Sequence, residues 1–306
     1  LPMMMKEAAK AKLITAERFG ESGLKDTFHA DWKFTPVKKG DKLDLGKRKL
    51  VFIPTPMLHW PDSMATYLTD ENLLFSMDAF GQHIATSQRF DDEAGLDVIM
   101  PEAAKYYANI LMPFGDLILK ALDSLSEFKI DMLAPSHGVI WRSHVSEIVN
   151  AYAMWGRGDT RNKALVIYDT MWGSTERMAR ALVEGIASAG VKVKLFNLSK
   201  TDRSDVVKDV QDARALLIGS PTLNNGMFPT VADFLCYLKG LKPKGKVGAA
   251  FGSHGWAGGA VKQIEEELGK AGVEVIKSDL AIKFVPDEDA IRRCVDFARA
   301  VANRLG

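Results

Sequence analysis

Short apolar runs alternate with amphipathic segments along the second half of the chain. Five runs are predicted strands, at residues 164–168, 191–197, 215–219, 247–251 and 273–276. Helices are predicted from Thr175 to about Ala189, where Gly190 ends the pattern, and over 230–239, 260–271 and 287–305. Strands that alternate with helices predict an α/β fold with a doubly wound parallel sheet, right-handed crossovers and both faces covered. Because ligands of such sheets bind beyond the carboxyl ends of the strands, the loops after the first, third and fourth strands are candidate sites.

The first half of the chain has a less regular pattern. Residues 43–54 are predicted to form a hairpin, 65–68 and 73–76 short strands, and 102–125 a helix that is interrupted at Pro113. A polar, glycine-containing stretch separates the two halves and is predicted to be a linker. We therefore expect domains at residues 1–155 and 164–306, joined by a linker at 156–163.

Composition narrows the classes of function. The length of 306 residues favours two domains, and 47% hydrophobic with 26% charged residues is the composition of a globular protein. The net charge of +1 gives no overall basic field for nucleic acid or anionic lipid, and no apolar run approaches the roughly 20 residues of a membrane span. Two cysteines exclude a disulfide framework, a four-thiolate iron–sulfur cluster and a rubredoxin-type iron site. We expect a cytoplasmic protein, because so few cysteines indicate a reducing compartment.

The loop after the first predicted strand, residues 169–176, has the composition of a phosphate-binding turn. It carries the hydroxyl groups of Thr170, Ser174 and Thr175 and leads into a helix. Backbone N–H groups at a helix N-terminus can hold a phosphate dianion with such hydroxyls and without Lys or Arg. The alternative is an ordinary helix cap. Neither a P-loop nor a G-x-G-x-x-G fingerprint follows this strand.

Two further loops favour a bound ring. Residues 219–226 and 252–259 are rich in Gly and small polar residues, so their backbones can approach a flat ring and hydrogen-bond its edge. Trp172 and Trp256 offer apolar faces beside it. Although two such loops could be plain surface turns, all three loops fall at one predicted edge of the sheet. The pattern therefore predicts a planar, phosphorylated cofactor.

Three metal-ligand candidates lie in the first half. His59 stands beside a Pro-containing turn, Asp78 follows an apolar strand, and His137 lies in a tight Pro-Ser-His-Gly turn. Two imidazoles and a carboxylate suit a divalent first-row transition metal, although each residue taken singly is more often structural.

The three loops of the second half resemble the C-terminal domain of the flavodiiron proteins, also called A-type flavoproteins. The resemblance spans residues 164–306 and rests on the segments Tyr168-Asp169-Thr170-Met171-Trp172, Ser174-Thr175-Glu176, Gly219-Ser220-Pro221-Thr222 and Gly252-Ser253-His254-Gly255-Trp256. It implies a flavodoxin-like, five-stranded doubly wound domain that binds FMN. The residues implied at the FMN are Thr170, Met171, Trp172, Gly173, Ser174, Thr175, Pro221, Thr222, Leu223, Asn224, Asn225, Gly226, Ser253, His254, Gly255, Trp256 and Gly258.

The first half resembles the metal domain of the same family. This domain has a metallo-β-lactamase-like (αββα) fold that holds two irons, and the similar segments are Leu58-His59-Trp60-Pro61-Asp62-Ser63-Met64, Asp78-Ala79-Phe80-Gly81 and Ser136-His137-Gly138. The resemblance implies that His59, Asp78 and His137 are iron ligands, with Asp78 bridging both irons. It also implies that His83 and one of Tyr106 or Tyr107, of which we favour Tyr107, lie near the irons without binding them.

The sequence departs from the family in one respect. The other iron ligands of the family come from an upstream H-x-E-x-D-H motif, which does not occur in these 306 residues, and Leu1-Pro2 resembles the tail of the segment that follows it. We therefore expect only the C-terminal portion of the metal domain here, with an exposed sheet edge and too few ligands for two irons. A truncated chain, or a separate N-terminal polypeptide that stays associated, would explain the departure.

For the intact enzyme, the resemblance implies an oxidoreductase that reduces O2 to water, or NO to nitrous oxide (N2O), at the diiron centre. FMN would take electrons from a separate small donor such as rubredoxin. The resemblance also implies a head-to-tail homodimer in which each flavin serves the irons of the partner. Two alternatives stay open: a flavodoxin-like electron carrier with an incomplete, non-functional metal site, and a metallo-hydrolase with a flavodoxin-like appendage.

Overall fold

The computed structural model describes residues 1–8 and 10–305 of the chain, which form two compact units. The first unit combines Leu1–Tyr106 with Phe114–Arg157, and the second combines Tyr107–Pro113 with the chain from Gly158 onward. A helix ends at Arg157 and a strand begins at Arg161, so within the predicted linker only residues 158–160 lie outside regular elements. None of the helices formed by the described residues has the length and apolar character needed to cross a membrane.

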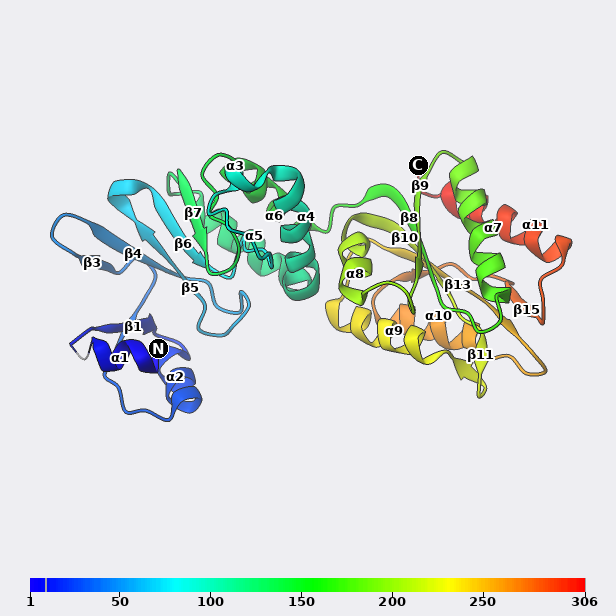
Figure 1. The fold of residues 1–306 in the computed structure, drawn as a ribbon, viewed down its shortest axis with the longest axis horizontal. Coiled ribbons are helices and arrows are strands. Elements are labelled where there is room, and N and C mark those ends of the chain that lie inside the picture. The colour runs from blue at the N-terminus through cyan, green and yellow to red at the C-terminus, as the bar shows by residue number, and fades with distance from the viewer. Residues whose placement is uncertain (9, 306) are drawn as a thin grey trace. The chain divides into compact units, whose positions relative to one another are not determined.

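The second unit is built on a parallel sheet (Figure 1). Its strands are β8 (Arg161–Tyr168), β9 (Lys192–Asn197), β10 (Ala213–Gly219), β13 (Val247–His254), β14 (Glu274–Val275) and β15 (Ala281–Lys283). The order across the sheet is β14-β13-β10-β8-β9, β15 also pairs with β13, and all of these pairings are parallel. Along the chain this is the flavodoxin-like order, 2-1-3-4-5, which confirms the prediction of a doubly wound sheet.

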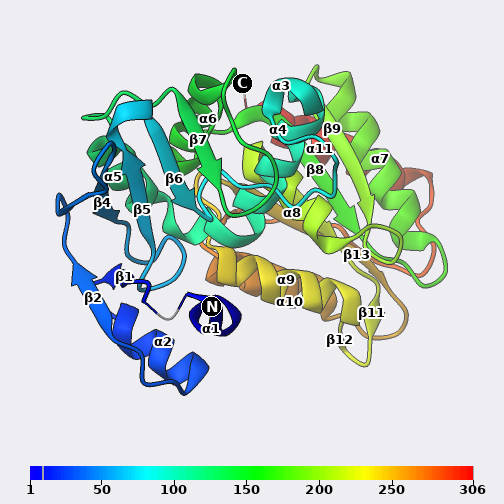
Figure 2. The same cartoon turned by 60° about the vertical axis from the view of Figure 1, so that its left-hand side comes forward.

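Helices cover both faces of this sheet, as Figures 1 and 2 show. They are α7 (Ser174–Ser188), α8 (Arg203–Asp212), α9 (Pro229–Leu241), α10 (Ala260–Lys270) and α11 (Glu288–Ala302). Val166 of β8 is buried in one apolar cluster with Leu182 of α7 and Ala298 of α11. Its neighbour Ile167 is buried in a second cluster, which draws on α8, α9 and α10. Consecutive residues of β8 thus pack into apolar clusters on opposite faces of the sheet, which explains why the sequence of β8 is a continuous apolar run.

Two elements of the second unit differ from the prediction. The expected strand at 273–276 is shortened to β14, which pairs with the start of β13, and the end of β13 pairs with β15, a strand that was not predicted. Between them, the Ser278 hydroxyl donates to the Ala250 carbonyl oxygen in place of a ladder hydrogen bond. Helix α8 was not predicted, because its buried face is made of Val206, Val207 and Val210, and β-branched residues are poor indicators of a helix.

The first unit contains a mixed sheet in the order β3-β4-β5-β6-β7. Its strands are β3 (Lys42–Asp44), β4 (Lys49–Pro54), β5 (Met64–Leu68), β6 (Leu73–Met77) and β7 (Met132–Pro135), of which only β6 and β7 pair in parallel. These strands include the predicted hairpin and both predicted short strands. A separate pair of parallel strands, β1 (Leu13–Ala16) and β2 (Phe34–Val37), was not predicted.

The helices of the first unit fall into two groups: the first two lie beside β1 and β2, and the other four lie on one face of the main sheet (Figure 1). They are α1 (Pro2–Glu7), α2 (Gly20–Phe28), α3 (Asp91–Ala94), α4 (Leu96–Tyr106), α5 (Gly115–Leu125) and α6 (Val145–Arg157). The predicted interruption near Pro113 is present, since a π-helix at Tyr107–Leu111 and a 3-10 turn at Met112–Phe114 separate α4 from α5. Along β6, Leu74 and Ser76 are buried whereas Phe75 and Met77 are exposed. The second face of the main sheet thus carries exposed apolar side chains.

Candidate functional site

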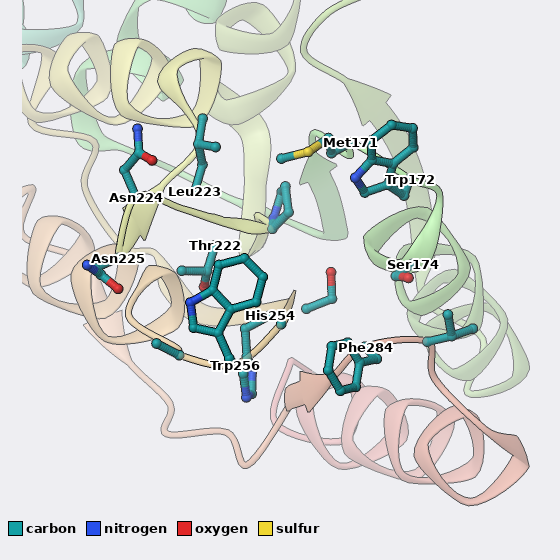
Figure 3. A pocket seen from close by; sticks show the side chains of 15 residues that line it. Met171, Trp172, Ser174, Thr222, Leu223, Asn224, Asn225, His254, Trp256 and Phe284 are labelled. Carbon is teal, nitrogen blue, oxygen red and sulfur yellow. The ribbon is translucent and has the colours of Figure 1, made fainter.

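A cavity of about 580 Å³ lies at the carboxyl-terminal edge of the parallel sheet (Figure 3). It lies where the order of a doubly wound sheet predicts a ligand, and its volume falls within the range of about 300 to 1,000 Å³ of small-molecule sites. The lining comes from the loops after β8, β10, β13 and β15. Its residues are Met171, Trp172, Ser174, Pro221, Thr222, Leu223, Asn224, Asn225, Ser253, His254, Gly255, Trp256, Ala257, Phe284 and Val285.

The turn before α7 presents a helix N-terminus to this cavity. Gly173 takes the position before the helix with φ of +84°, and no side chain caps the first turn of α7. The Gly173 N–H donates to Thr170 Oγ1 at 3.0 Å, which closes the turn, and the Ser174 side chain reaches the cavity (Figure 3). An uncapped N-terminus beside a hydroxyl group is suited to a phosphate dianion.

A second wall of the cavity is the hairpin of β11 (Thr222–Leu223) and β12 (Gly226–Met227). Asn224 and Asn225 connect the strands with φ of 48° and 62°, the left-handed conformation that a two-residue hairpin turn requires. The Gln263 side chain of α10 accepts a hydrogen bond from the Met227 N–H at 3.0 Å. The hairpin is therefore fastened to α10 rather than left as a free loop.

Aromatic rings surround the cavity. Trp172 and Trp256 are 88% and 93% exposed, and they come from the loops after β8 and β13 (Figure 3). Phe284, after β15, adds a third ring, and the Lys283 ammonium lies 5.3 Å from its centroid. Among the lining residues only His254 has a titratable side chain. Exposed indoles around a nearly uncharged cavity can cover the apolar faces of a planar ring, so the site fits a phosphorylated ring cofactor.

The cavity gathers most of the residues that the sequence suggested for a flavin. Thr170, Gly173, Thr175, Gly226 and Gly258 do not line it and lie within or behind its loops. Thr175, for example, is buried with its Oγ1 3.0 Å from Ser253 Oγ, so it joins two loops. Sequence reasoning missed Ala257, Phe284 and Val285. An exposed apolar pair directly before Pro286 was the available signal for the last two, but it follows β15, a strand that was not predicted.

In the first unit, the three metal-ligand candidates meet. The Asp78 carboxylate lies between two imidazoles, with Oδ2 3.1 Å from His59 Nε2 and Oδ1 3.2 Å from His137 Nε2. Each oxygen faces a different histidine, as a carboxylate that bridges two metal ions would require. Within residues 1–8 and 10–305, however, no group of three or more His, Cys, Asp or Glu side chains is arranged to hold a metal ion. These three donors fit part of a two-metal site and not a whole one.

A tyrosine and a third histidine adjoin this group. The Tyr106 ring centroid lies 4.8 Å from that of His83 and 5.7 Å from that of His137, and the two histidine rings are 5.2 Å apart. Burial, with a smaller contribution from the Asp78 charge, raises the pKa of Tyr106. The tyrosine ring beside these two histidines is that of Tyr106, and the placement of Tyr107 near the irons stays a prediction.

Gln82, which sequence reasoning missed, supports the turn that carries His137. Its side chain is fully buried, and its Oε1 accepts from the Val139 N–H at 2.8 Å. Its own backbone N–H donates to the His137 carbonyl oxygen at 3.3 Å. A Cβ on Gly138 would lie 2.2 Å from Gln82 Oε1, so only glycine fits there. A buried amide beside Gly81 was too common a pattern to single out from sequence.

Two family models match the chain, ODP family beta lactamase over residues 1–138 and flavodoxin over residues 166–297. Among known proteins, a nitric oxide reductase of Moorella thermoacetica is 50% identical over 99% of this chain and 77% of its own length. Among solved structures, rubredoxin oxygen:oxidoreductase from Desulfovibrio gigas matches with a TM-score of 0.96 and 37% identity, over 99% of this chain and 77% of that chain. A flavodiiron protein from Giardia intestinalis matches with a TM-score of 0.91 and 34% identity, over 96% of this chain and 73% of that chain. The chain thus spans about three quarters of the length of each.

Proposed function

Because the chain belongs to the flavodiiron protein family of oxidoreductases, we propose that it reduces O2 to water, or NO to nitrous oxide, with electrons from a small donor protein. Family membership implies FMN and a diiron centre as cofactors. The names of the Moorella and Desulfovibrio relatives, nitric oxide reductase and rubredoxin oxygen:oxidoreductase, support both substrates and a donor of the rubredoxin kind. We infer that the reaction takes place in the cytoplasm.

The observation that carries this proposal is the cavity at the carboxyl ends of the parallel strands. We assign the FMN phosphate to the uncapped first turn of α7 and the Ser174 hydroxyl. The ring would lie between the β11–β12 hairpin and the loop after β13, where Trp172 and Trp256 exclude water from its faces. When bound there, FMN accepts electrons and releases them one at a time.

For the irons we propose that His59, Asp78 and His137 are ligands, with Asp78 shared between both. This assignment is supported by the two imidazoles, each of which lies beside a different oxygen of the Asp78 carboxylate. Three donors do not complete two iron sites, so we propose that the remaining ligands come from a segment with the H-x-E-x-D-H motif outside these 306 residues. Two features of the first unit support such a segment: the exposed Phe75 and Met77 on β6, and an isolated pair of parallel strands, which is marginal without further strands.

We also propose a head-to-tail homodimer in which each flavin serves the partner's irons. The exposed Trp172, Trp256 and Phe284 around the cavity support it, because a contiguous apolar rim on a surface indicates a contact with another protein.

The alternative function is a flavodoxin-like electron carrier, which the incomplete set of metal-ligand donors favours. Iron content distinguishes the two, since a carrier binds FMN without iron.

Replacing Ser174 with Asp tests the flavin assignment. The new carboxylate would lie where the phosphate dianion binds, so we expect FMN affinity to fall by about 100-fold or more, because a like charge opposes the phosphate at the helix N-terminus. Fluorescence titration of the flavin-free chain with FMN measures this loss. The matched variant Ser174→Ala removes one hydroxyl without adding charge and should cost about tenfold. Undiminished FMN binding by Ser174→Asp would show that the phosphate lies elsewhere.

A further inference from the structure

Asp169 is a buried carboxylate directly behind the turn to which we assign the FMN phosphate. It follows β8, and its side chain is 1% exposed and does not line the cavity. Three donors converge on it. Oδ1 accepts from the Thr170 N–H at 2.7 Å and from Ser199 Oγ at 2.6 Å, and Oδ2 accepts from Thr230 Oγ1 at 2.5 Å. These donors are neutral, and their hydrogen bonds offset the cost of burying a carboxyl group there.

The three donors belong to three separate segments of the second unit. Thr170 lies in the turn between β8 and α7, Ser199 lies between β9 and α8, and Thr230 lies in the first turn of α9. Asp169 thus ties the turn to two neighbouring elements. The connection continues within the turn, because the Thr170 side chain accepts from the Gly173 N–H at 3.0 Å. Gly173 is the residue before the uncapped N-terminus of α7.

We propose that Asp169 is a positioning residue that holds this turn in the shape that admits a phosphate, and thereby sets the preference for FMN over riboflavin. The inference rests on the proposed FMN site. The affinity of a phosphate site made of backbone N–H groups depends on the directions in which those groups point. No Lys or Arg lines this cavity, so no cationic side chain can substitute for a misplaced N–H group. Loss of the Asp169 contacts should therefore reduce the contribution of the phosphate to the binding free energy of FMN and leave the contribution of the ring unchanged.

The test compares FMN with riboflavin, which lacks the phosphate, by fluorescence titration of the flavin-free chain. For Asp169→Ala we expect FMN affinity to fall about tenfold or more while riboflavin affinity changes less than about twofold. Asp169→Asn should restore FMN affinity to within about threefold, because its oxygen still accepts from the Thr170 N–H and its amide can donate to the Thr230 hydroxyl. At saturating FMN, the phosphorus resonance of the bound phosphate should shift in Asp169→Ala while the visible flavin spectrum stays the same.

Two further variants separate positioning from folding. Thr230→Val removes one donor from outside the turn and should lower FMN affinity by about threefold with no effect on riboflavin. Asp209→Ala removes a buried carboxylate beside Lys163, at the opposite end of β8, and should lower the melting temperature with no change in the ratio of the two affinities.

The inference would be overturned if Asp169→Ala lost affinity for FMN and for riboflavin equally. It would also be overturned if this variant kept wild-type affinity for FMN and showed no shift of the phosphorus resonance. An Asn variant as weak as the Ala variant would also overturn it, because the effect would then belong to the charge. A wild-type chain that binds neither flavin would instead contradict the proposed function.

Discussion

Lys246 is a buried lysine at the start of β13, at the amino-terminal edge of the parallel sheet. Its Nζ donates to the carbonyl oxygens of Gln211 and Ala213 at 2.8 and 2.6 Å. Burial lowers the pKa of Lys246 from 10.5 to about 7, although the nearby Asp212 opposes the shift. Between these two pH values the unfolded chain binds more protons at this residue than the folded chain does. Its contribution to stability should therefore rise with pH across that window.

The variant Lys246→Met tests this dependence of stability on pH. We expect the difference in unfolding free energy between wild type and variant to increase by about 2 kcal/mol in favour of wild type from pH 7 to pH 9. Urea unfolding at the two pH values measures it, and the lost hydrogen bonds add only a constant offset. The measurement stops at pH 9 because burial raises the pKa of Cys294 from 9.0 to about 11, which makes stability fall as pH rises between those values. A difference that does not change with pH would contradict the assignment.

At the scale of elements, the hairpin β11–β12 forms one wall of the cavity and packs against the helix α10. Gln263 of α10 accepts from the Met227 N–H, and the Ala260 N–H donates to Thr222 Oγ1 at 3.4 Å. At the start of α10, a Cβ on Gly259 would lie 2.2 Å from the Asn225 carbonyl oxygen. The close approach of hairpin and helix therefore depends on the absence of a side chain at residue 259.

Gly259→Ala should separate the hairpin from α10. We expect a loss of about 1 to 3 kcal/mol in unfolding free energy and weaker binding of both FMN and riboflavin, because the wall that contacts the ring moves. Gly269→Ala is the matched control: it lies within α10, and its Cβ would have no neighbour within 4 Å, so it should be neutral or slightly stabilising. Calorimetry and flavin titration report the two effects. Identical behaviour of both variants would show that the contact between residues 225 and 259 does not shape the cavity.

For the whole molecule, sequence periodicity predicted the doubly wound sheet because long buried strands such as β8 and amphipathic helices such as α7 carry strong patterns. It failed where elements are short or held by long-range pairing, as with β1, β2 and β15. The cavity followed from the sheet order, and its missed residues Phe284 and Val285 directly follow β15, one of these short strands. The contact of the Tyr106 ring with His83 and His137 could not be predicted from sequence, because it joins residues that lie far apart along the chain.

We propose that the chain carries an FMN site in its second unit and part of an iron site in its first. The flavin and metal content of the chain, prepared together with a segment that carries the H-x-E-x-D-H motif, tests it most directly. We predict about one FMN and two irons per chain, loss of the iron with unchanged flavin absorption in Asp78→Ala, and retention of both in the surface control Asp123→Ala. Zinc without flavin would show that neither proposed site exists, and full iron content in Asp78→Ala would show that Asp78 is not an iron ligand.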